Sequence, residues 1–187
     1  MPLDIKNLQQ PWGSSTQDTK TTKPQARTTS SHAPVLLLGL GNSIMGDDGV
    51  GLYVLRRLKQ IIPPSDGLEF KEVSIGGIKL VEEILDYKTV FIIDSIESPT
   101  TIGNIHEFSP EQFNNALHES TPHTTNFITA LELYKKLELK RVPETIRIFT
   151  IDIDPHYTFS ETLSPKVQEA AAKLTELVAR EIRRTLS

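Results

Sequence analysis

The sequence predicts an α/β fold in which a mostly parallel sheet is covered by helices on both faces. Two short, almost wholly apolar runs, Val35–Leu38 and Thr89–Ile93, are typical of strands buried on both sides. Apolar residues at helical spacing lie between such runs, and strands that alternate with helices form parallel sheets. A length of 187 residues fits one domain of ordinary size.

The first half of this domain contains three predicted strands and two predicted helices. Gly39 ends the first strand, the Pro63-Pro64 pair stops the first helix, and Gly76-Gly77 forms a turn before the second. In chain order we expect a strand over 35–38, a helix over 50–58, a strand over 68–74, a short helix over 80–85 and a strand over 89–93.

The second half continues the alternation with two strands and two helices. We expect a strand over 102–108, a helix over 126–137, a strand over 145–153 and a final helix that runs to about residue 182. Ser164 and Pro165 predict the start of that last helix, because serine is a favoured N-cap and proline a favoured first residue.

The N-terminal segment differs from the rest of the chain. Residues 1–33 are rich in Ser, Thr, Gln, Lys and Pro and lack apolar periodicity. Such a segment cannot bury enough apolar surface to offset its conformational entropy. We therefore expect a disordered tail over 1–33 and a single α/β domain over 34–187.

Composition excludes several classes of function. The 20 basic and 24 acidic residues give a net charge of -4, which argues against a globally basic nucleic-acid binder. Cysteine is absent, which rules out disulfides, thiolate zinc sites and a cysteine nucleophile. Neither a signal-peptide core nor an apolar stretch of about 18 residues occurs. We expect a cytoplasmic protein without a nucleic-acid or membrane partner.

The loop after the first strand does not suit a nucleotide. The third glycine of a dinucleotide fingerprint would fall at Ile44, and no lysine of a P-loop is present. Asp47 and Asp48 stand at the start of the following helix, where a phosphate would use the free amides and the positive end of the dipole. The loop therefore predicts a site for a cation or a neutral group, without an organic cofactor.

Two glycines in the first turn of that helix, Gly49 and Gly51, are open to two interpretations. Each costs a helix about 1 kcal/mol relative to alanine. In one interpretation Asp47 caps the helix and the glycines allow close packing on the sheet. In the other, the bare backbone lets another chain approach Asp48.

Two further residues are candidates for metal ligands. Asp94 ends an apolar strand, so its carboxylate is expected at the carboxyl edge of the sheet, and His123 directly precedes a helix. Taken singly, Asp94 also fits a loop cap, and His123 fits a solvated side chain. Together with Asp48 they would supply two oxygens and one imidazole nitrogen, a set that suits a divalent transition metal such as nickel.

Other motifs are less favourable. Asp152 and Asp154 follow the last strand in a pattern also found in phosphoryl-transfer sites, but a loop cap is the favoured interpretation. Asp94-Ser95-Ile96 lacks the glycine of the aspartic-protease motif. Neither the Gly-x-Ser-x-Gly elbow of serine hydrolases nor the His-Glu-x-x-His helix of zincins occurs.

Three segments in the right order resemble the motifs of the hydrogenase maturation endopeptidases. These enzymes remove the C-terminal extension from the large subunit of nickel–iron hydrogenases. The segments are 38–51, 91–94 and Pro122-His123, and the segment 163–167 is also similar. The resemblance extends over about residues 35–183 and leaves the tail outside it.

The resemblance implies a three-layer α/β sandwich with a largely parallel five-stranded sheet. It implies that Asp48, Asp94 and His123 converge on a nickel ion that the substrate precursor supplies, with Asp48 and Asp94 as candidate catalytic groups. Many members carry aspartate before the Gly-Gly pair where this chain has Ile75.

The resemblance also names a partner, the large-subunit precursor, which a monomer of this chain would process. The expected substrate-binding residues are Gly41, Asn42, Asp47, Gly49, Gly76 and Gly77. The alternative that stays open is a non-catalytic nickel-binding assembly factor on the same scaffold.

Overall fold

The structure is a computed structural model that describes residues 35–63, 65–74, 76–98, 100–117, 122–137, 141–156 and 159–186. Of the helical residues 114–117 and 122–126 only the backbone is described. The expected disorder of residues 1–33 therefore concerns a segment outside this part of the chain.

Five strands form one sheet in the order β2-β1-β3-β5-β4. Neighbouring strands are parallel except β4, which runs antiparallel to β5 at one edge. This arrangement confirms the largely parallel five-stranded sheet. The strands are β1 (Val35–Leu40), β2 (Leu68–Val73), β3 (Thr89–Glu97), β4 (Ile105–Phe108) and β5 (Thr145–Ile153).

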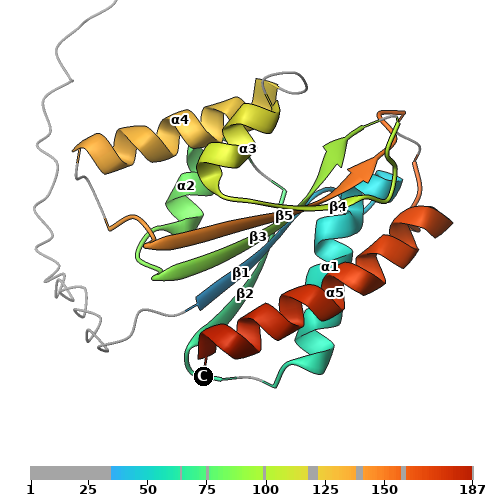
Figure 1. Cartoon of the computed structure of the whole chain (residues 1–187), viewed down its shortest axis with the longest axis horizontal. Helices are drawn as coiled ribbons and strands as arrows, with labels where there is room; N and C mark the ends of the chain where they lie inside the picture. Colours follow the sequence, from blue (N-terminus) through green and yellow to red (C-terminus); the bar gives the residue numbers. More distant parts are fainter. Residues whose placement is uncertain are drawn as a thin grey trace, which may run out of the picture. The chain divides into compact units, whose positions relative to one another are not determined.

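Helices cover both faces of this sheet, which makes three layers (Figure 1). On one face lie α1 (Val50–Ile61) and α5 (Pro165–Leu186), and on the other lie α2 (Ile78–Ile84), α3 (Pro110–Leu117) and α4 (Pro122–Leu137). Alternate residues of each central strand enter opposite cores. Leu37 packs on the α1 and α5 side, whereas Leu36 packs on the other. All six residues of β1 are buried, as the wholly apolar run predicts.

Several elements differ from the prediction. Helix α4 begins at Pro122 instead of residue 126, so His123, expected just before the helix, lies in its first turn. Strand β3 continues past Asp94 to Glu97, because residues 94–97 pair with the end of β5, although the pairing of β3 with β1 ends at Ile93. Strand β4 begins only at Ile105, since a turn around Gly103 precedes it. Helix α3 was not predicted, and of its described side chains only Phe113 is buried. A single buried apolar side chain gives too weak a periodic pattern to predict a helix.

The chain leaves β1 and β3 toward opposite faces of the sheet. After β1 it enters α1, whereas after β3 it continues to β4, α3 and α4. Loops that diverge in this way leave a crevice above the carboxyl ends of adjacent parallel strands. The fold therefore places a candidate site between β1 and β3. None of the helices in the described part combines the length and apolar composition needed to cross a bilayer.

Candidate functional site

A cavity of about 370 Å³ lies at the carboxyl ends of β1, β2 and β3. Six of the residues predicted from the sequence line it, namely Gly41, Asn42, Asp48, Gly76, Gly77 and Asp94. The remaining lining residues are Leu40, Ser74, Leu80 and Phe127. Residues from four separated stretches of the chain thus meet in one place, as the rule for parallel strands and the family resemblance both implied.

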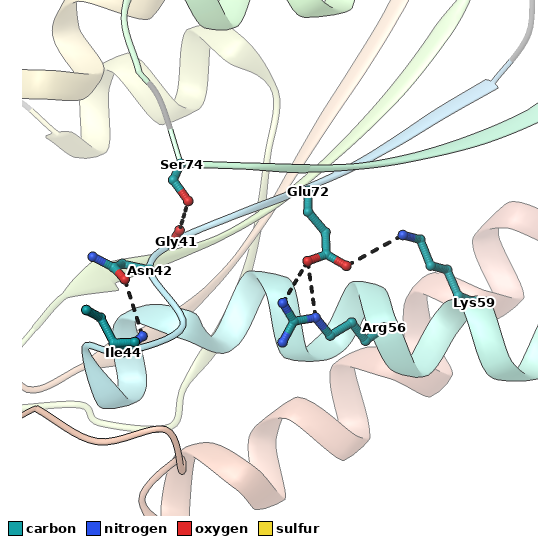
Figure 2. A network of polar contacts seen from close by, with 7 residues as sticks. All are labelled: Gly41, Asn42, Ile44, Arg56, Lys59, Glu72 and Ser74. Atoms are coloured by element: carbon teal, nitrogen blue, oxygen red, sulfur yellow. Dashed lines mark hydrogen bonds and ion pairs between the residues drawn. The ribbon is translucent and has the colours of Figure 1, made fainter.

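The loop after β1 folds back on itself and carries Asp48 to the cavity. Gly41 has φ 132°, and a Cβ there would overlap the backbone carbonyl of Asp48, so only glycine fits. The Asn42 side chain accepts a hydrogen bond from the amide of Ile44 at 3.2 Å (Figure 2). The hydroxyl of Ser74, at the end of β2, donates to the Gly41 carbonyl at 2.8 Å (Figure 2). The loop is therefore held from within and from the neighbouring strand.

The two helical glycines serve close packing. A Cβ at Gly51 would overlap the carbonyls of Leu40 and Ile93, because the first turn of α1 sits against the ends of β1 and β3. Gly49 is buried, and a Cβ there would lie 3.1 Å from the Asn42 carbonyl. Gly49 does not line the cavity, so its predicted substrate contact receives no support from the lining residues.

Asp94 is half-buried in β3 and lines the cavity. Burial raises the pKa of Asp94 to about 7; the amide of Ser95, which donates to Oδ1 at 2.8 Å, opposes this shift, and the negative charge of Asp48 adds to it. A carboxyl group with this pKa is partly protonated at neutral pH. Perturbed titration in a crevice is a common property of functional sites.

Ser95 links the two aspartates and was not predicted from the sequence. Its amide contacts Asp94, and its hydroxyl donates to Oδ1 of Asp48 at 3.2 Å. Successive strand residues point to opposite faces, which allows Ser95 to reach Asp48 while Asp94 lines the cavity. Its position directly after Asp94 was the only signal in the sequence.

Asp47 has a role different from the helix cap considered above. Its Oδ1 accepts a hydrogen bond from the amide of Ser164 at 2.6 Å, just before α5. The N-cap of α1 is Gly49, and no side chain caps that helix. The cap interpretation is therefore wrong, because the carboxylate turns toward α5 instead. Asp47 lines a second cavity of about 330 Å³, to which Asp48 also contributes.

His123 lies in the first turn of α4, one turn before Phe127, whose side chain lines the first cavity. The His123 side chain and all of Ile75 lie outside the described residues. Within the described part, no three His, Asp or Glu side chains are close enough to hold a metal ion. The structure thus brings Asp48 and Asp94 to one cavity, and the metal-binding role of Asp48, Asp94 and His123 stays a prediction.

Asp152 and Asp154, at the end of β5, bind different partners. Asp152 is buried, and its carboxylate binds the hydroxyl of Thr101 at 2.5 Å and His106 Nε2 at 2.9 Å. The carboxylate of Asp154 accepts from the backbone amide of His156 at 2.8 Å, as a loop cap does. These contacts favour structural roles over a shared phosphoryl-transfer site.

Comparisons with known proteins identify the family and the fold of this chain. The sequence model of the hydrogenase maturation protease family matches residues 52–181. The hydrogenase 2 maturation protease of Escherichia coli K12 is 26% identical over 156 residues, which cover 76% of this chain and 91% of the relative.

Solved structures of similar proteins have the same fold. The [NiFe] hydrogenase maturation protease HybD of Thermococcus kodakarensis is 28% identical, with a TM-score of 0.61 over 79% of this chain and 97% of the other. The hydrogenase maturating endopeptidase HybD of E. coli has a TM-score of 0.66 at 20% identity, over 81% and 93% of the two chains. Since the family match alone spans well over half of the sequence, this chain belongs to the hydrogenase maturation protease family and is a peptidase.

Proposed function

We propose that this peptidase removes the C-terminal extension of a nickel–iron hydrogenase large-subunit precursor after nickel has been inserted. The observation that carries the proposal is that Asp48 and Asp94 line one cavity at the carboxyl edge of the sheet. Relatives of the chain are named as hydrogenase maturation proteases, one of them for a [NiFe] hydrogenase.

Nickel in this proposal belongs to the substrate and acts as the recognition signal. The carboxylates of Asp48 and Asp94, with His123 as the predicted third ligand, complete the coordination of an ion that the precursor already holds. Oxygen and imidazole ligands are harder than thiolates. The chain has no cysteine of its own that would compete for the metal. Such a site can recognise the ion without removing it from the precursor.

Hydrolysis then occurs at a peptide bond that passes through the cavity. The oxygen of a water molecule bonds to the carbonyl carbon, the C–N bond breaks, and the released amine takes up a proton. Asp48 and Asp94 are the candidate groups for moving that proton. The backbone of Gly41, Gly76 and Gly77 lines the same space and offers hydrogen-bonding groups to an extended peptide.

The decisive experiment compares nickel-loaded with nickel-free precursor. We expect the mass of the large subunit to fall by that of the extension only when nickel is present. Equal trimming of both forms would exclude nickel recognition, and trimming of neither would exclude this substrate. Nickel-dependent binding without any loss of mass would instead indicate a non-catalytic assembly factor.

Variants at the two carboxylates connect that activity to the cavity. Asp48→Asn and Asp94→Asn keep the size of the side chains, and each should slow trimming by about 100-fold or more, the range associated with lost acid–base groups. Asp66→Asn, at an exposed turn before β2, is the matched control and should trim normally. Circular dichroism checks that all three variants fold. Normal rates in both cavity variants would exclude this site.

A further inference from the structure

Two apolar side chains close to the site are unusually exposed. Phe159 is 88% exposed and Ile44 is 50% exposed, whereas most aromatic and branched aliphatic side chains of the described residues are buried. Single exposed apolar residues are common, but a nearly fully exposed phenylalanine leaves a large apolar area in water. Aromatic residues are enriched at the centres of protein–protein interfaces.

The backbone presents these two side chains on a fixed support. Met45 and Ser160 form an isolated parallel bridge, although the two residues are far apart in the chain. The amide of Ser160 donates to the Ile44 carbonyl at 3.1 Å, and the amide of Gly46 donates to the Ser160 carbonyl at 2.7 Å. A surface that is already ordered loses less conformational entropy on binding.

This support is continuous with the candidate site. The segment from Ile44 leads within four residues to Asp48, which contributes to both cavities. Met45 and Ser160 themselves line the second cavity. Across the first cavity, Ile78 follows the lining residue Gly77 and is 52% exposed. Exposed apolar side chains therefore adjoin lining residues of both cavities to which Asp48 contributes.

We propose that Ile44 and Phe159 form a docking surface for the folded body of the large-subunit precursor. This inference rests on the proposed function, because it places the same substrate on the rim of the same site. Asp48 contributes to both cavities, and the bridged residues Met45 and Ser160 line the second. We therefore expect a folded precursor whose scissile bond reaches Asp48 to lie against this bridge. The apolar pair supplies affinity for the protein substrate, whereas the carboxylates select its metal.

The test separates affinity from chemistry. Phe159→Ser and Ile44→Ser should each raise the KM for nickel-loaded precursor about tenfold, a loss typical of an interface anchor. They should leave kcat within about twofold and the melting temperature unchanged, since both side chains are exposed. Ile61→Ser is the matched control: it is 47% exposed at the far end of α1 and should change neither constant.

A direct binding measurement keeps this test independent of trimming. Surface-immobilised precursor should bind the parent chain and the Ile61→Ser variant with equal affinity. It should bind the two docking-surface variants, Ile44→Ser and Phe159→Ser, about tenfold more weakly. Equal binding by all four proteins would overturn the docking surface even if trimming is normal. The parent chain could instead fail to trim the precursor while the docking-surface variants still bind it more weakly than the parent does. That result would overturn the proposed function but would support the docking surface. A dimer that Phe159→Ser converts to a monomer in size-exclusion chromatography would assign the patch to a second copy and overturn the proposal.

Discussion

The hydroxyl of Ser95 donates a hydrogen bond to Oδ1 of Asp48 across 3.2 Å, although 47 residues separate the two in the chain. The bond joins β3 to the short 3-10 helix over Gly46–Gly49, and both aspartates of the cavity thereby contact one serine. A donor that fixes a carboxylate in one orientation reduces the reorganisation needed when that carboxylate acts. We therefore expect Ser95 to act as a positioning residue for Asp48.

Removal of this hydroxyl should lower the rate without unfolding the domain. We expect Ser95→Ala to reduce kcat for trimming about tenfold, in line with the loss of a hydrogen bond to a charged group. Ser95→Thr keeps the hydroxyl and should recover most of the activity. The measurement is initial rates on nickel-loaded precursor, with melting temperatures for each variant. Equal losses in both variants would indicate that steric fit, and not the hydroxyl, matters at this position.

Gly41 should tolerate no side chain. It combines φ 132° with a Cβ position that overlaps the Asp48 carbonyl, so Gly41→Ala must displace the loop that carries Asp48. We expect a loss of about 1–3 kcal/mol in the free energy of unfolding and little remaining activity. Gly67→Ala is the control, because a Cβ at Gly67 meets nothing within 4 Å. Urea unfolding checks both, and equal stabilities would contradict the geometry of this loop.

Arg147 should contribute more to stability than an exposed arginine does. It lies 5.6 Å from the ring centre of Phe91 and 5.2 Å from that of Phe149, and it binds Glu107 and Glu181. Loss of stacking and two ion pairs in Arg147→Ala should cost about 2–3 kcal/mol.

The exposed pair between Arg56 and Glu72 is the matched control for this comparison (Figure 2). Its two side chains are 53% and 33% exposed, so solvent screens their attraction. Arg56→Ala should therefore cost less than about 1 kcal/mol. Denaturant unfolding at one pH compares the two variants, and equal costs would show that stacking on the sheet adds nothing.

Asp94 should make stability depend on pH. Its pKa is raised to about 7 in the folded chain, above the value of about 3.9 for an unfolded aspartate. The folded state therefore holds an extra proton between these values, and the contribution of Asp94 to stability falls as the pH rises through them. Between pH 5 and pH 7.5 the parent should lose about 2 kcal/mol more than Asp94→Asn. Parallel pH profiles of the unfolding free energy for the two proteins would contradict the raised pKa.

Local sequence signals were sufficient for most of the fold. Apolar runs predicted the central strands because both faces of such a strand are buried, as in β1. They failed where pairing with another strand decides the outcome. Asp94 and Ser95 read as the end of a strand, but β5 continues beside them and supplies hydrogen bonds to residues 94–97. The local signals also failed for Asp47, because the residue that its carboxylate binds, Ser164, lies 117 residues away in the chain.

For the candidate site, too, some features follow from the sequence and others only from the tertiary structure. By itself, the sequence determined the residue types at the carboxyl edge of the sheet, namely two carboxylates, a glycine-rich loop and the absence of cysteine. Only the tertiary structure decided that Ser95 binds Asp48 and that Gly51 packs against the ends of β1 and β3. It alone also showed that the exposed residues Ile44 and Phe159 directly precede the two bridged residues Met45 and Ser160. Residue types and hydrophobic periodicity depend only on residues that are neighbours in the chain. Contacts between distant segments depend in addition on the register in which the strands pair and on how the helices pack.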